Sequence, residues 1–201
     1  MMKKTLLAAA ALCALTSGAA MAQNYPQDGK WMVRARAVHL DSANKDSTPL
    51  DLSVNNKMIP ELDISYFFTP NFAAELILTY PQKHDVRAGG AKIGSLKHLP
   101  PTLLAQYHFT NLGAFKPYVG AGINYTRFSC FVILGGALNV KKNSFGPALQ
   151  VGFDYALDKN WSINFDVKKV YIKTDVRSFG TKVGTFKVDP LLVGVGLGYR
   201  F

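Results

Sequence analysis

Hydrophobic and polar residues alternate with a period of two along most of the chain after residue 30. In the segment 61–68 every second residue from Leu62 to Phe68 is apolar, and the residues between them, from Glu61 to Ser65, are polar. Such alternation predicts a β-strand that separates an apolar from a polar environment. The same pattern recurs in seven further segments: 31–37, 72–80, 101–109, 118–125, 148–155, 161–168 and 191–201. We therefore expect eight strands.

The links between these segments alternate in length. Short links, rich in turn residues, lie at 69–71, 110–116 and 158–160, and long ones lie near 41–57, 81–97, 128–144 and 173–187. Three short turns and four long loops suit an eight-stranded up-and-down barrel with both termini on the short-turn side. No Pro-rich or Ser-rich linker interrupts the pattern, so we predict one all-β domain, an antiparallel β-barrel.

Alternation alone does not decide which face lies inside, and a soluble lipocalin-like barrel stays the alternative. A transmembrane barrel is favoured because the polar faces are rich in glycine, which suits the narrow bore of eight strands. The apolar faces also carry aromatic residues near the strand ends, as in the interfacial girdles of outer-membrane barrels. The chain ends in Tyr199-Arg200-Phe201, and terminal aromatic residues such as Tyr199 and Phe201 look like the assembly signal of bacterial outer-membrane barrels.

The first 22 residues have the features of a secretory signal peptide. Lys3 and Lys4 precede an apolar, Ala-rich stretch, and Ala20-Met21-Ala22 forms a small-x-small site before Gln23. We expect cleavage between Ala22 and Gln23, which leaves a barrel domain at 23–201. Cys130 is then the one cysteine of the mature chain, so an intramolecular disulfide is excluded. These features predict an integral protein of the bacterial outer membrane with periplasmic N- and C-termini.

The chain is basic, with 23 Lys and Arg residues against 13 Asp and Glu residues. Nucleic-acid binding is the usual interpretation of such a balance, but export argues against it. The expected partners are outer-membrane lipid, the phosphates of lipopolysaccharide, periplasmic chaperones and the barrel-assembly machinery. Simple solubility of exposed basic loops explains the charge equally well.

Charged and polar side chains are predicted to line the lumen. In a narrow bore such charges should pair, because an unpaired buried charge is costly. Both a closed, salt-bridged plug on the periplasmic side and a pathway stay open at this point. The residues are Arg34, Arg36, Glu61, Asp63, Glu75, Gln106, His108, Asp154, Asp166, Lys168 and Arg200.

Prolines gather near the outer strand ends. Pro100 and Pro101 lack the amide donors of a strand ladder, and successive residues face opposite neighbours, so a donor is lost on each side. The pair either marks the start of a strand or holds open a lateral gate in the wall. The apolar segment Phe131-Val132-Ile133-Leu134 is a candidate lining for such a gate.

Catalysis and metal binding have little support. His39, His84 and His98 lie near the outer side, but no two of them have ligand spacing on one strand, and no Gly-x-Ser-x-Gly motif occurs. We expect no catalytic residues, no cofactor and no metal.

Several motifs together resemble the OmpW family. They are Lys97-His98-Leu99-Pro100-Pro101-Thr102, Gln106-Tyr107-His108-Phe109, the segment 116–126, Ser144-Phe145-Gly146, Asp158-Lys159-Asn160-Trp161 and the segment 193–201. The resemblance implies an eight-stranded outer-membrane barrel that admits small apolar compounds, with lateral exit through the wall as the proposed route. The third long loop is apolar here, unlike the acidic and polar loop of many members. The expected function is passive, porin-like uptake of small hydrophobic solutes; the alternative is a closed structural barrel that contacts lipopolysaccharide or external partners.

Overall fold

The fold was analysed in a computed structural model that describes residues 29–133, 138–178 and 181–201. The expected signal peptide at 1–22, its cleavage site and Leu134 lie outside the described residues. Over the described ranges, no helix is long and apolar enough to cross a membrane.

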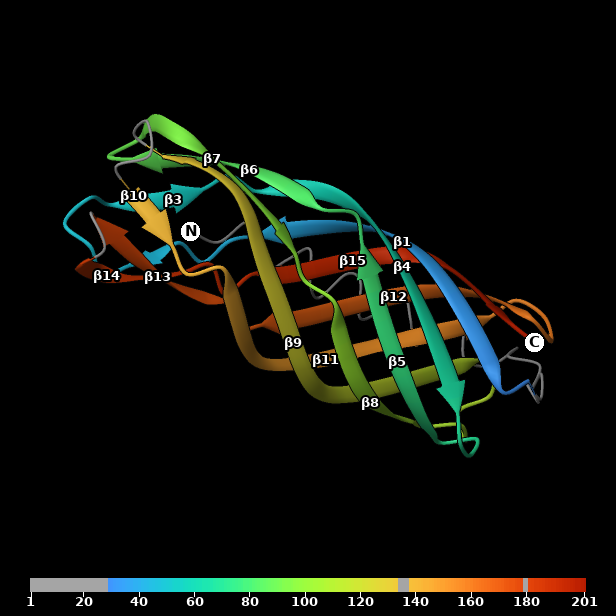
Figure 1. Cartoon of the computed structure of the whole chain (residues 1–201). Helices are drawn as coiled ribbons and strands as arrows, with labels where there is room; N and C mark the ends of the chain where they lie inside the picture. The colour runs from blue at the N-terminus through green and yellow to red at the C-terminus, as the bar shows by residue number, and fades with distance from the viewer. Residues whose placement is uncertain (1–28, 134–137, 179–180) are drawn as a thin grey trace, which may run out of the picture.

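Eight long antiparallel strands close into a barrel (Figure 1). They are β1 (Trp31–Asp41), β4 (Lys57–Phe67), β5 (Phe72–Thr79), β8 (Thr102–His108), β9 (Phe115–Ile133), β11 (Asn143–Ala156), β12 (Trp161–Val170) and β15 (Leu191–Arg200). Each strand pairs with the next in chain order, and β15 pairs with β1 to close the wall. All eight predicted strands are confirmed, as is the eight-stranded up-and-down β-barrel.

The first and last strands of the barrel, β1 and β15, pair with each other and close the wall. The amide of Phe201 donates to the carbonyl of Trp31 over 2.8 Å, and the amide of Trp31 donates back over 3.0 Å. The ring of Tyr199 packs edge-on against Trp161, with centroids 4.9 Å apart. The two terminal aromatics expected to signal assembly therefore lie on the outer face of the closing strand.

The long links are more ordered than the sequence suggested. They contain seven short strands: β2 (Lys45–Asp46), β3 (Leu52–Val54), β6 (Gln82–Ala88), β7 (Ala91–Leu99), β10 (Leu138–Val140), β13 (Lys173–Ser178) and β14 (Thr181–Lys187). These strands gather at the end opposite the C-terminus (Figure 1). Strand β6 alternates in burial, but its inward positions include Gln82 and His84. Because polar residues fill these inward positions, the hydrophobic pattern that would reveal a strand is absent.

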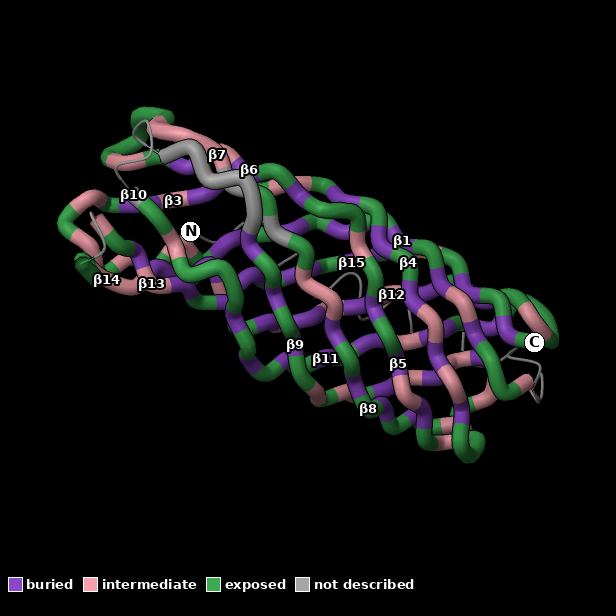
Figure 2. The backbone as a smooth tube through the Cα atoms, in the orientation of Figure 1, coloured by how far each residue is buried: buried purple, intermediate pink, exposed green. Residues whose placement is uncertain are grey.

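Burial alternates along the barrel strands (Figure 2), and in the half next to the short turns the exposed residues are mostly apolar and the buried ones mostly polar. On β15, Val195 and Leu197 are more than half exposed, whereas on β1 Arg34 is fully buried. This polarity is the reverse of a soluble lipocalin-like barrel, whose apolar face points inward. The apolar exterior and polar interior are those of a transmembrane barrel.

The interior has two layers. Charged side chains fill the half next to the short turns, while an apolar cluster fills the half next to the long links. Members of that cluster include Leu40, Ile59, Ile77, Phe128 and Leu192. The boundary between these layers lies inside the barrel and positions the candidate site.

Candidate functional site

A network of buried charges crosses the bore in the short-turn half. Arg34 of β1 contacts Asp154 of β11 at two points, with Nε 3.1 Å from Oδ1 and Nη2 2.8 Å from Oδ2. Its Nη1 lies 3.1 Å from Asp63 of β4 and donates to Ser65 over 2.9 Å. One arginine thus joins strands on different sides of the lumen.

Arg36, two residues further along β1, extends the network toward the other end. Its guanidinium lies 2.8 Å from both Glu61 of β4 and Glu75 of β5. Lys168 of β12 then contacts Glu61 over 2.5 Å and Asp166 over 2.9 Å. Charge-assisted hydrogen bonds of this kind are among the strongest in proteins, and here they leave each cation with several acceptors.

All eleven residues expected to line the lumen are buried, none more than 6% exposed. They are Arg34, Arg36, Glu61, Asp63, Glu75, Gln106, His108, Asp154, Asp166, Lys168 and Arg200. At the short-turn end, Arg200 donates to the carbonyl of Gly29 over 2.6 Å, and its guanidinium lies 3.7 Å from the ring centroid of Phe67.

Uncharged members of the network were missed from the sequence. The Tyr118 hydroxyl donates to Asp166 over 3.0 Å, and the Gln150 amide donates to Glu75 over 2.9 Å and to Asp166 over 2.7 Å. Both residues lie on the polar face of their alternating segments, so their position in the pattern could have identified them as lumen residues. Gly152 makes room for this tyrosine, since a Cβ there would lie 2.6 Å from the Tyr118 hydroxyl.

The network forms a packed floor. Its ion pairs run from β1 to β4, β5 and β11, and from β12 to β4. An eight-stranded barrel is only wide enough for side chains to fill, and these charges satisfy one another at short distances. The short-turn half is therefore a salt-bridged plug in the described structure.

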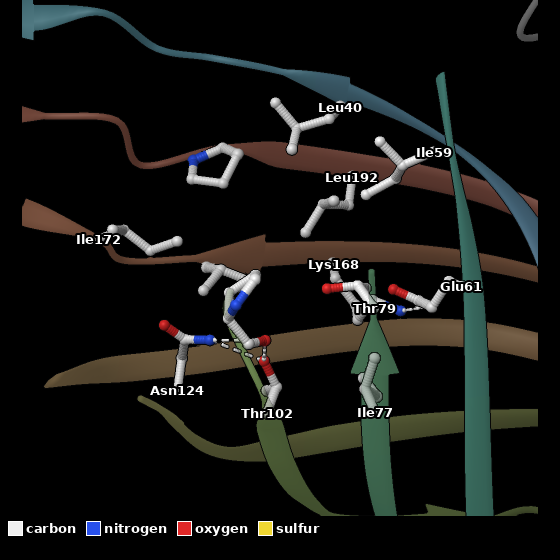
Figure 3. A pocket seen from close by; sticks show the side chains of 13 residues that line it. Leu40, Ile59, Glu61, Ile77, Thr79, Thr102, Asn124, Lys168, Ile172 and Leu192 are labelled. Atoms are coloured by element: carbon white, nitrogen blue, oxygen red, sulfur yellow. Dashed lines mark hydrogen bonds and ion pairs between the residues drawn. The ribbon is translucent and has the colours of Figure 1, made fainter. Parts of the chain in front are cut away.

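An apolar cavity lies directly above this floor (Figure 3). The Glu61–Lys168 pair forms its base, and the free volume of the cavity is about 20 Å³, room for about one water molecule. The lining residues are Leu40, Ile59, Glu61, Ile77, Thr79, Pro100, Thr102, Asn124, Lys168, Val170, Ile172, Pro190 and Leu192. The Thr79 hydroxyl is buried there without a hydrogen-bond partner among the described residues. Most of the lining is aliphatic and suits an apolar occupant. The surrounding side chains must move apart to admit a molecule larger than water.

Pro100, one of the two prolines expected to form a gate, lines this cavity. Neither proline separates β8 from β9, however. The carbonyl of Pro101 accepts a hydrogen bond from the amide of Tyr125 on β9 over 3.1 Å. The Asn124 side chain adds bonds of 3.3 Å to the Pro100 carbonyl and 2.8 Å to the Thr102 hydroxyl. The wall between β8 and β9 is therefore joined at this level.

Strand pairing in the barrel wall is interrupted around the segment Tyr80-Pro81. Pairing of β4 with β5 ends at Glu61 and Thr79, and pairing of β5 with β8 ends at Ile77 and Thr102. Beyond Pro81, strand β6 pairs with β7 from Gln82 onward, and with β3 only from Val86 to Ala88. Across the described chain, no strand register includes Tyr80 or Pro81, and we refer to these two residues as the strut.

Three prolines border this region. Pro60 stands on β4 facing the strut, Pro81 belongs to it, and Pro100 precedes β8. None of them donates a backbone hydrogen bond. Neither Pro81 nor the stretch of β4 that lacks a partner on its β5 side was singled out from sequence, because pairing between distant segments is a tertiary property.

The apolar segment after residue 130 follows a different path. The backbone of Val132 pairs with Ser95 and that of Ile133 with Gly94, both on β7. Phe131 lies on the same stretch of β9, and Leu134 lies outside the described residues. These residues belong to the β7–β9 ladder at positions several residues away from Pro100. The segment does not start next to Pro100, as a lining of the expected gate would.

The described side chains of His39 and His84 do not belong to a common site, and the side chain of His98 lies outside the described part of the structure. The ring of His84 lies 3.0 Å from the Asn55 carbonyl through Nδ1, and burial lowers the pKa of this imidazole. His39 is exposed on the outer face of β1. No group of three or more His, Cys, Asp or Glu residues in the described ranges could hold a metal ion.

Comparison with known proteins identifies the architecture. Residues 27–201 match the OmpW family. The chain belongs to the OmpW family. Outer membrane protein W of Vibrio cholerae is 34% identical, with all of both chains covered. An uncharacterized outer-membrane protein of Sinorhizobium fredii, y4mB, is 48% identical over 85% of this chain and 80% of that protein.

Other OmpW-type proteins extend the comparison. Protein DoxH of Pseudomonas sp. strain C18, named for a dibenzothiophene metabolism operon, is 28% identical over 82% of this chain and 80% of its own length. The crystal structure of the outer membrane protein OprG from Pseudomonas aeruginosa superposes with a TM-score of 0.74 and 28% identity, over 90% of this chain and 98% of OprG. The protein is thus an outer-membrane barrel of this family.

Proposed function

We propose that the barrel takes up small apolar solutes passively and releases them sideways into the membrane. The observation that carries this proposal is an apolar cavity that ends on a salt-bridged floor and touches the least-paired part of the wall. A solute in the cavity meets the buried Glu61–Lys168 pair below it. Entering that network would separate buried charges that are paired with one another, at a cost of several kcal/mol. Sideways exit avoids this cost.

The strut is the proposed exit. Ile59 and Thr79 line the cavity and directly precede Pro60 and Tyr80. Separating two paired strands in hydrocarbon exposes backbone groups at a cost of several kcal/mol each. Where prolines have already removed the donors, fewer groups lose a partner when the wall opens. The gate therefore centres on Pro60, Pro81 and Pro100, whereas Pro101 lies on the joined side of β8, where its carbonyl bonds to β9.

The cavity lining indicates the solute class. Most of its side chains are aliphatic, and the Thr79 hydroxyl offers one isolated polar contact. A relative named for dibenzothiophene metabolism is consistent with an aromatic hydrocarbon or sulfur heterocycle of similar size. Sugars and ions would lose their hydration without replacement.

The test uses vesicles with a lipopolysaccharide outer leaflet, with and without the protein, and compares uptake of naphthalene with uptake of xylose. The variant Pro60→Thr, Pro81→Thr and Pro100→Thr restores three donors around the strut. It should take up naphthalene several-fold more slowly while remaining a folded, heat-modifiable barrel. Pro147→Thr is the matched control, because Pro147 lies in a paired stretch and its carbonyl already accepts from Tyr171 over 3.0 Å.

A second variant, Thr79→Phe, fills the cavity without changing the wall and should also slow naphthalene uptake. If the wild type gives no protein-dependent uptake of naphthalene, the closed structural barrel is the better interpretation. Equal acceleration of xylose would indicate an open pore. Hydrolysis or modification of lipid by the purified protein would instead reveal an enzyme, which we do not propose.

A further inference from the structure

Three lysines stand side by side on the sheet at the long-link end. Lys173 of β13 is the register partner of Lys187 on β14, which in turn is the partner of Lys45 on β2. Directly opposed residues on antiparallel strands project from the same face with Cβ atoms about 4.5–5.5 Å apart. Like charges in this arrangement repel and destabilise the sheet. All three side chains are exposed, and we call them the lysine row.

The nearby carboxylates are occupied elsewhere. Asp175 accepts from Lys182 over 2.8 Å and from the Thr185 hydroxyl over 3.0 Å. These bonds hold the pKa of the Asp175 carboxyl below its usual range. No ion pair joins the lysine row to a carboxylate of the described chain.

Two further acidic residues lie at this surface. Asp189 lines the hollow beside Lys173 and Lys187, and its Oδ1 accepts from the Ile172 amide over 2.9 Å. Asp46 bonds within the adjoining loop. Its carboxylate accepts from the Thr48 amide over 2.9 Å, from the Thr48 hydroxyl over 2.6 Å and from the Leu52 amide over 2.7 Å. In the described part of the chain, the three ammonium groups therefore have carboxylates near them but form no ion pair with any of these.

The row borders a wide cleft whose empty space is about 1050 Å³ including its mouth. Next to it is a second hollow of about 550 Å³ including its mouth, which is lined by Phe145, Gly146, Pro147, Tyr171, Lys173, Lys187 and Asp189. Phe145 is 64% and Tyr171 41% exposed. A cationic cleft and an aromatic hollow thus meet at the same two lysines.

The position of the row relative to the lipid-facing surface is informative. On the outward face of β12, Lys169 follows the last apolar residue, Val167, and Tyr171 comes next beyond the strand. Lys173 lies two residues further, about 6.6 Å away in an extended chain. Phe145 is at the corresponding end of the outward face of β11. The three lysines therefore lie directly beyond the end of the apolar band, at the height of lipid headgroups.

We propose that the lysine row binds the phosphorylated glucosamine headgroup of lipid A, the lipid anchor of lipopolysaccharide, while an acyl chain lies against Phe145 and Tyr171. Phosphate monoesters carry nearly two negative charges and several acceptor oxygens, so one phosphate can bond with all three ammonium groups. The site relies on the expected orientation, in which the long-link end faces outward. It does not depend on solute uptake.

The experiment measures thermal unfolding of the purified, folded protein in detergent with added lipids. Bisphosphorylated lipid A should raise the unfolding temperature, whereas dephosphorylated lipid A, phosphatidylglycerol and inorganic phosphate should have little effect. The variant Lys45→Gln, Lys173→Gln and Lys187→Gln should be as stable as wild type, or more so, without lipid. Its apparent affinity for lipid A should fall about tenfold or more, as expected for lost charge-assisted bonds.

Two further variants distinguish specific binding at the lysine row from non-specific attraction by the positive charge of the protein. Lys83→Gln, Lys92→Gln and Lys97→Gln removes three lysines from the β6–β7 hairpin at the same end of the barrel, and should keep lipid A binding. Replacing the three lysines of the row by arginines keeps the charge and should also keep lipid A binding. This variant tests the role of the charge even if the glutamine variant folds poorly. Equal losses in the two glutamine variants, or equal stabilisation by phosphatidylglycerol or phosphate, would overturn the proposal.

Discussion

At the scale of single residues, the interior depends on two arginines that each bond to several strands. Arg36 contacts Glu61 on β4 and Glu75 on β5, and its Nε donates to Asn164 on β12 over 2.7 Å. Removing such a side chain leaves carboxylates buried without a counter-charge. That loss is far costlier than the loss of an exposed ion pair.

We therefore predict that Arg36→Ala destabilises the barrel by about 3–5 kcal/mol. Urea unfolding of the protein in lipid vesicles, followed by tryptophan fluorescence, measures this change. Lys92→Ala is the control, since it removes an exposed ion pair with Asp85 and should leave the midpoint almost unchanged. If the two midpoints match, the interior charges do not stabilise the fold.

At the scale of strands, glycines allow the closing pair to approach. A Cβ on Gly196 of β15 would lie 2.1 Å from the carbonyl oxygen of Ala35 on β1, and 2.8 Å from the Cα of Arg36. Backbone atoms cannot move aside without shifting the strand. Gly194, on the same face of β15, differs because its nearest neighbour is a Val38 methyl group at 3.0 Å.

Gly196→Ala should consequently reduce stability by about 1–3 kcal/mol, the usual cost of overpacking, and lower the yield of heat-modifiable barrel. Gly194→Ala should be tolerated much better, because a side chain can rotate away. Gel mobility of unheated samples and urea midpoints measure both variants. A Gly194→Ala defect as large as that of Gly196→Ala would argue against backbone contact as the cause.

At the scale of the whole molecule, the apolar exterior fixes the barrel in a membrane, and the two ends differ strongly. One end has short turns such as 157–160 and the C-terminus, while the other carries hairpins that extend the wall. In outer-membrane barrels the longer connections face outward. The same orientation underlies the proposed uptake route and lipid A site.

We predict that an impermeant maleimide labels Ala91→Cys on intact cells and does not label Lys159→Cys, both in a Cys130→Ser background. Ala91 begins β7 at an exposed hairpin tip, and Lys159 lies in an exposed turn. Labelling of both positions after cell lysis is the control for reactivity. The reverse pattern on intact cells would invert the topology.

The sequence by itself determined the eight barrel strands, their order and the polar face of each, because a period of two is a local property of each strand. Placing that polar face inside needed further signals: the glycines, the aromatic residues near the strand ends and the terminal residues. Charges at every second position, such as Glu61 and Asp63, were enough to assign a polar face. The strands inside the long links were not predictable, since inward Gln82 and His84 hide the alternation.

Only the tertiary structure decided which residues meet. Arg34 bonds with Asp154 across 120 positions of sequence, and strand closure rather than any local pattern brings them together. The cavity, the strut at Tyr80-Pro81 and the lysine row likewise depend on register between distant segments. Strand register is fixed by packing and hydrogen bonding across the whole closed sheet, so no single segment of sequence contains it.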